Sequence, residues 1–187
     1  MTSIYLTQSR MIMQLPIAEE IIVQSLTHID IQIVCKYQSF SEDLIDYLIE
    51  EDGMLFSLIK YQYVPEWIIA KQINKIDSDS WSMLSMNQTL SNEFMHEHME
   101  QLDKISRDMI CRFQTLSSWF IRAHANDLDW TMLSECQVMN PSIMTEFHDR
   151  LTACDNTTKN IIRVKIAHVF EEKGIAFKDA CNIVEYL

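Results

Sequence analysis

The sequence predicts an all-α fold, a short-repeat α-solenoid of about six two-helix repeats with helical end caps, and three observations predict it. The 187 residues include only 2 glycines and 3 prolines, too few for the turns of a β-sandwich or for a glycine-rich phosphate-binding loop. Hydrophobic residues make up 48% of the chain, which is typical of a globular protein. The third observation is an internal repeat with a period of 23 to 26 residues.

Six similar segments begin at residues 17, 40, 64, 90, 116 and 139, and the first residue of each is called position zero. Positions four and five are apolar in every repeat. They hold Ile21 and Ile22, Leu44 and Ile45, Ile68 and Ile69, Phe94 and Met95, Phe120 and Ile121, and Ile143 and Met144. A glutamine stands two residues before each later repeat, at Gln38, Gln62, Gln88, Gln114 and Gln137.

Each repeat is expected to form two short helices, A and B. Helix A begins at a residue that favours the first turn, namely Ser41, Pro65, Ser91, Ser117 or Asn140. An aspartate at position thirteen ends helix A and caps helix B in four repeats, at Asp30, Asp77, Asp103 and Asp129. The pattern predicts that Phe94, Phe120, Leu102 and Leu128 are nearly fully buried.

A repeat this short cannot bury its apolar face alone, so stacked repeats are expected to share one continuous core. The predicted layout is a single domain over 1–187. Residues 1–16 form an N-terminal cap, 17–151 the repeats and 152–187 a C-terminal helical cap. A helical bundle without a true repeat is the alternative.

The string LSxxFI…H…LDW…LSxxQ is clearest in Leu116–Gln137. It resembles the LSExFI…LDWxxISxYQ repeat of short helical-repeat proteins from phages, plasmids and large DNA viruses. The similarity covers residues 16–151 and is close in Leu90–Gln114. This resemblance implies a helical scaffold from a virus or mobile element, and it implies no catalytic residue.

Charge is distributed unevenly along the chain. The net charge is −12, whereas residues 17–155 alone hold 23 acidic and 9 basic residues. Such a chain is not expected to bind nucleic acid directly, and an anionic membrane would repel it. We expect the repeats to present an acidic face to a basic partner, with an exposed tryptophan as apolar anchor. The residues expected to bind the partner are Asp43, Asp46, Glu50, Glu51, Glu93, Glu97 and Trp119.

The predicted function is a non-enzymatic protein-interaction module. In its leading form it is a phage or mobile-element inhibitor that binds a basic, nucleic-acid-binding host defence protein or a nucleoprotein complex. No cofactor is expected. No signal peptide or membrane span is recognised, and the five cysteines form no CxxC pair, so the cytoplasm of a host cell is the expected location. The alternatives are a structural or assembly protein and a small enzyme or metal-binding protein.

Two groups of residues carry the enzyme or metal alternative. His96 and His98 form a titratable cluster with nearby glutamates, but their spacing of two places them on different sides of a helix. Both His98 and His124 occupy position eight, so stacking is expected to bring them together. Cys136 and His148 form the second group.

The repeated glutamines have two possible interpretations, and the tryptophans divide into core residues and one exposed residue. A glutamine at each turn between repeats is expected to bond open backbone groups, and a recognition ladder is the alternative. Trp67, Trp81 and Trp130 are interpreted as core residues, and Trp119 as an exposed contact residue.

Overall fold

The computed structural model describes residues 16–26, 28, 30–51 and 53–154. Their secondary structure consists of α-helices and short 3₁₀-helices, and no strand occurs within these residues. The predicted all-α class is therefore confirmed. The two predicted end caps lie outside the described residues, apart from Pro16 at one end and 152–154 at the other.

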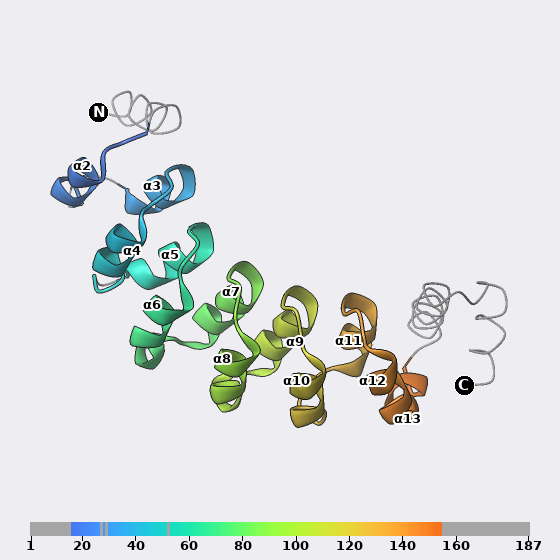
Figure 1. Cartoon of the computed structure of the whole chain (residues 1–187). Coiled ribbons are helices and arrows are strands. Elements are labelled where there is room, and N and C mark those ends of the chain that lie inside the picture. The colour runs from blue at the N-terminus through green and yellow to red at the C-terminus, as the bar shows by residue number, and fades with distance from the viewer. Residues whose placement is uncertain (1–15, 27, 29, 52, 155–187) are drawn as a thin grey trace. The chain divides into compact units, whose positions relative to one another are not determined.

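The chain divides into two compact units, Met1–Thr89 and Leu90–Leu187. In both units helix A and helix B alternate along the chain (Figure 1). The first unit holds α2 (Glu19–Gln24), α3 (Ile31–Tyr37), α4 (Glu42–Leu48), α5 (Met54–Tyr61), α6 (Glu66–Lys71), η1 (Ile73–Lys75) and α7 (Ser78–Asn87). The second unit holds α8 (Asn92–Glu97), η2 (Met99–Gln101), α9 (Lys104–Phe113), α10 (Ser118–Ala123), α11 (Trp130–Cys136), α12 (Pro141–Glu146) and α13 (His148–Thr152).

The helices begin where the sequence predicts. Serine side chains accept a hydrogen bond from the third residue of helix A at Ser41, Ser91 and Ser117. Position-thirteen aspartates cap helix B in the same way at the start of α7, α9 and α11, and Asp30 caps α3 by accepting from its second residue, Gln32. Gly53 replaces the aspartate before α5 and has a φ of 78°, in the left-handed region that glycine tolerates best.

Both helices of a repeat contribute buried side chains to the core of each unit. In the first unit the B helix α5 packs against the B helices α3 and α7, and in the second the B helix α11 packs against the B helix α9 and against α13, which follows α12 in the sixth repeat. The residue four places before each glutamine is completely buried, as at Leu58 and Leu133. The four side chains predicted to be nearly fully buried are at most 6% exposed, so their predicted burial is confirmed: Phe94, Phe120, Leu102 and Leu128.

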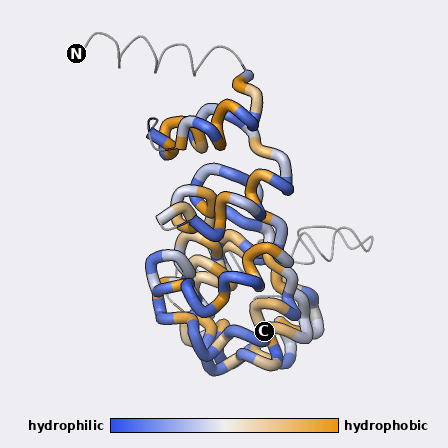
Figure 2. Tube along the Cα trace, turned by 90° about the vertical axis from the view of Figure 1, so that its left-hand side faces the viewer, coloured by the Kyte–Doolittle hydropathy of each residue, from blue (hydrophilic) through white to orange (hydrophobic). Residues whose placement is uncertain are grey.

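The apolar side chain at position four is not buried in the first repeat. Ile21 is 56% exposed, whereas position five of the same repeat, Ile22, is buried. No described repeat precedes Ile21 to cover it. Hydrophobic and hydrophilic segments elsewhere follow one another at short intervals along the helical turns (Figure 2), as one-sided burial of amphipathic helices requires.

Among the described residues, no helix has the length and apolarity to span a membrane.

The five glutamines bond the backbone at the turns between repeats, and we call this set the glutamine ladder: Gln38, Gln62, Gln88, Gln114 and Gln137. Each Oε1 accepts the N–H of the first residue of its own repeat, at 2.8 to 3.2 Å. The Nε2 of Gln88 donates to the carbonyls of Ile59 and Gln62 in the preceding repeat, and Gln62 and Gln137 make the equivalent pairs of bonds. The structural interpretation of the glutamines is confirmed.

Candidate interaction surface

Side chains of successive A helices meet in a fixed register within each unit. Position six of one repeat faces position seven of the next: Asp46 accepts two hydrogen bonds from the Lys71 ammonium at 2.6 and 2.8 Å. Arg122 and Glu146 form the same pair in the second unit with the charges exchanged, at 2.7 Å. These ion pairs therefore link neighbouring repeats at the protein surface.

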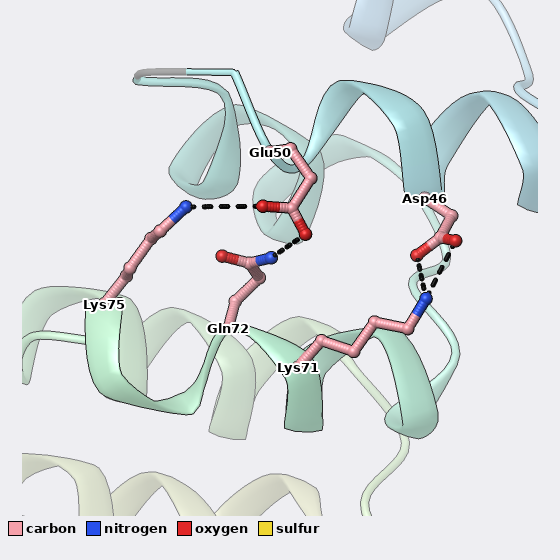
Figure 3. Close-up of polar contacts among 5 residues, drawn as sticks. All are labelled: Asp46, Glu50, Lys71, Gln72 and Lys75. Atoms are coloured by element: carbon pink, nitrogen blue, oxygen red, sulfur yellow. Dashed lines mark hydrogen bonds and ion pairs between the residues drawn. The ribbon is translucent and has the colours of Figure 1, made fainter.

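Glu50 is also engaged by the next repeat (Figure 3). Its carboxylate accepts a hydrogen bond from Nε2 of Gln72 at 2.6 Å and lies 3.7 Å from the Lys75 ammonium. Gln72 is only 2% exposed, and its Oε1 has no hydrogen-bond partner among the described residues. Two of the four acidic residues predicted in repeat two, Asp46 and Glu50, thus lie beside lysines.

Asp43 and Glu51 differ from Asp46 and Glu50 in having no lysine partner among the described residues. Both are exposed, and within the described part of the chain neither forms an ion pair. Glu93 and Glu97 are exposed on α8 in the second unit. The seven predicted site residues are therefore divided between the units, with four in the first and Glu93, Glu97 and Trp119 in the second.

Trp119 is 41% exposed, as predicted for a contact residue. It lies on α10 at position three of its repeat, and its ring centroid is 5.5 Å from that of His96 and 5.9 Å from that of Phe120. Its neighbours fix one edge of the ring and leave part of the ring in solvent.

The prediction that Trp67 is a core residue is wrong, because Trp67 is 50% exposed. It occupies position three of its repeat, on α6, the register position that Trp119 holds on α10, and the Lys71 ammonium lies 4.5 Å from its ring centroid. The repeat register contained this signal, since the other position-three residues include Asp43 and Glu93. Of the other two tryptophans, Trp81 is buried at 2% exposure and Trp130 is half-buried.

The expected pairing of His98 with His124 is also wrong. Nδ1 of His96 lies 2.8 Å from Nε2 of His124, whereas His98 packs against Phe94 with ring centroids 4.7 Å apart. The reason is the offset between adjacent A helices, which places position six of one repeat beside positions seven and eight of the next. Burial, and secondly the neighbouring His96, lower the pKa of His124 below its usual value.

The candidate cysteine and metal chemistry finds little support in the geometry. Burial raises the pKa of the Cys35 thiol to about 11 and that of the Cys111 thiol to about 12, which suits packing rather than nucleophilic attack. Cys136 is exposed, and His148 does not bond it: Nδ1 of His148 lies 3.6 Å from Asp149, and its Nε2 has no hydrogen-bond partner among the described residues. Within the described ranges, no three residues of the ligating types gather closely enough to hold a metal ion.

Comparison with known proteins identifies no matching family model, no similar curated protein and no similar solved structure. The chemistry of the described surface is therefore the basis for any functional proposal.

Proposed function

We propose that the protein is an interaction module whose A helices bind a basic, nucleic-acid-binding protein. One observation carries the proposal. In each unit, position three presents an exposed carboxylate in one repeat and an exposed tryptophan in the next: Asp43 and Trp67 in the first unit, Glu93 and Trp119 in the second.

These two residue types contribute differently to binding. Tryptophan is enriched among the few residues that supply most of the affinity of an interface. Exposed carboxylates add only about 0–1 kcal/mol per ion pair, but they increase the rate of encounter with a basic partner. An exposed ring and an exposed carboxylate at position three of successive A helices therefore supply both affinity and attraction.

The paired carboxylates have another role in this proposal. Asp46 and Glu50 hold Lys71 and Lys75, and so fix the spacing of the A helices that present Asp43 and Trp67. Their charge is partly neutralised at the surface. We therefore assign most of the attraction in the first unit to Asp43 and Glu51.

The resemblance to phage, plasmid and viral repeats supports the biological setting. An inhibitor of a host defence complex would meet a basic surface that normally holds nucleic acid. We propose such a protein as the partner, with the cytoplasm of the host cell as the location. A scaffold that requires no catalytic residue is consistent with this role.

Substitution of the two exposed tryptophans tests the proposal. Protamine, an arginine-rich nucleic-acid-binding protein, serves as a defined probe, and binding is measured by surface plasmon resonance. We expect the double substitution Trp67→Ala with Trp119→Ala to weaken binding at least tenfold, mainly by faster dissociation. Ile105→Ala is the control, because Ile105 is 60% exposed on α9, which is a B helix.

Circular dichroism establishes that each variant folds. Equal affinities for the wild type, the double variant and the control would refute the tryptophan anchor. Failure of the wild type to bind protamine at low salt would refute the choice of a basic partner.

A further inference from the structure

A basic residue, an aromatic residue and a glutamine recur at the end of helix B in three repeats. The tripeptides are Lys36-Tyr37-Gln38, Lys60-Tyr61-Gln62 and Arg112-Phe113-Gln114. The glutamine belongs to the ladder, so the first two residues of each tripeptide need a separate explanation. In the first unit we call Lys36, Tyr37, Lys60, Tyr61 and Tyr63 the basic–aromatic edge.

The cations of these tripeptides differ from the other cations of the described chain. Six described basic residues lie beside carboxylates or bond backbone or amide oxygens: Lys71, Lys75, Lys104, Arg107, Arg122 and Arg150. The remaining three, Lys36, Lys60 and Arg112, have no carboxylate within ion-pair distance among the described residues. Lys36 and Lys60 are exposed, so their charges are available to an anion.

Aromatic rings accompany these charges. The Lys36 ammonium lies 5.3 Å from the ring centroid of Tyr37, and the Lys60 ammonium lies 5.1 Å from that of Tyr61. Tyr37 is 43% exposed and Tyr63 is 66% exposed. Large exposed rings beside cations are the features that proteins use to stack and neutralise nucleic-acid strands.

A cavity of about 520 Å³ lies at this edge. It is lined by Lys36, Tyr37, Tyr61 and Tyr63, and Glu42 is the carboxylate in its wall. Ligand sites commonly have volumes of about 300–1,000 Å³. The cavity is therefore large enough for a small group such as a base.

The glutamine ladder also changes the electrostatics of the edge. The C-terminal end of a helix normally repels anions because its last carbonyls are unpaired. At the end of α3, Gln62 donates to the carbonyls of Cys35 and Gln38, and at the end of α5, Gln88 donates to those of Ile59 and Gln62. Bonded carbonyls present less negative potential to an approaching phosphate.

We propose that the basic–aromatic edge binds single-stranded nucleic acid, with bases stacked on Tyr37 and Tyr63 and phosphates beside Lys36 and Lys60. The rings favour a nucleic acid over an acidic peptide, because acidic side chains offer no planar group to stack. This proposal departs from the expectation that the net charge of −12 excludes nucleic acid. The described acidic residues of the first unit largely lie on the A helices or within the lysine pairs, whereas Lys36 and Lys60, in the last turns of α3 and α5, form no ion pair with any described residue.

The test measures fluorescence anisotropy of a labelled twelve-residue oligothymidylate at about 20 mM and about 200 mM salt. The double variant Lys36→Gln with Lys60→Gln is compared with Lys75→Gln with Lys104→Gln, which removes the same charge elsewhere. We expect the first variant to weaken binding at least tenfold and the control to change it less than threefold. Two phosphate contacts predict a slope of about −1.4 for log affinity against log salt, which the first variant reduces towards zero.

Two further variants test the cavity itself. Tyr37→Ala with Tyr63→Ala is expected to weaken binding about tenfold or more, since each stacked base contributes about 1–3 kcal/mol. Glu42→Gln is expected to strengthen binding of the anionic oligothymidylate, because it removes a negative charge from the cavity wall. Weaker binding of the oligothymidylate by this variant would contradict the proposal.

Unlabelled polyglutamate distinguishes a nucleic acid from an acidic protein. If polyglutamate competes as well as oligothymidylate, or if oligothymidylate does not bind the wild type at the lower salt concentration, the proposal is wrong. Equal losses in the two lysine double variants would also overturn it. Weak competition by polyglutamate, together with selective loss in the Lys36 and Lys60 variant, is the result that supports it.

Discussion

Replacing Gln88 with methionine tests how the repeats are held together. The Gln88 side chain is 3% exposed and makes three hydrogen bonds. Its Oε1 accepts from the N–H of Val64 at 2.8 Å, and its Nε2 donates to the carbonyls of Ile59 at 2.6 Å and Gln62 at 2.8 Å. Gln88→Met preserves most of the volume and removes all three bonds, leaving buried backbone groups unpaired.

The cost follows from these contacts. A net contribution of about 0.5–1.5 kcal/mol for each of the three hydrogen bonds gives about 1.5–4.5 kcal/mol for the set. The bonds join the end of α5 and the start of the next repeat to the end of α7, so the loss is expected to be concentrated in the first unit. A loss of about 3 kcal/mol corresponds to a change of about a hundredfold in an opening equilibrium.

Native-state hydrogen exchange of the α5 and α7 amides measures this equilibrium, and urea unfolding followed by circular dichroism gives the global loss. Gln32→Met is the matched control, because Gln32 is an exposed residue of α3 in the same unit. If Gln88→Met and Gln32→Met accelerate exchange equally, the glutamine ladder does not stabilise the repeats.

Three further predictions concern the second unit and the lysine pairs. Phe120→Ala is expected to cost about 3–5 kcal/mol in urea unfolding, because Phe120 is fully buried, and a loss below about 1 kcal/mol would contradict the repeat register. Stability is expected to fall as the pH drops through the unfolded pKa of histidine, 6.5, because the unfolded chain takes up a proton that the folded His124 resists. His124→Asn should reduce this pH dependence between about pH 7.5 and 5.5, and an unchanged profile would contradict it. A double-mutant cycle of Asp46→Asn and Lys71→Met is expected to give a coupling of at most about 1 kcal/mol, since both side chains are partly exposed, and a coupling of 3 kcal/mol or more would show that the pair does more than set spacing.

The local features of the fold could be predicted from the sequence because each depends on neighbours in the chain. A serine before helix A or an aspartate before helix B caps a helix whose start lies within three residues of it. The glutamine ladder was predictable because the same residue type recurs at one register position. A continuous stack of all six repeats stays a prediction, and so does the role of the acidic residues in partner binding.

Contacts between adjacent A helices could not be predicted, because their offset is set by packing. The sequence register aligns His98 with His124, yet it is His96 that meets His124. The same offset pairs Asp46 with Lys71, whereas the sequence predicted Asp46 only as a partner-binding residue. The exposure of Trp67 was predictable from its position-three register, where Asp43 and Glu93 stand in other repeats, although tryptophan as a residue type favours burial.

The association rate with protamine tests the central claim, that position three of the A helices attracts a basic partner. Asp43→Lys and Asp79→Lys each reverse one exposed acidic residue in the first turn of a helix, on α4 and α7 respectively. The account predicts that Asp43→Lys slows association several-fold at low salt and hardly at all at high salt, whereas Asp79→Lys has a much smaller effect. Equal association rates for the two variants at low salt would contradict it.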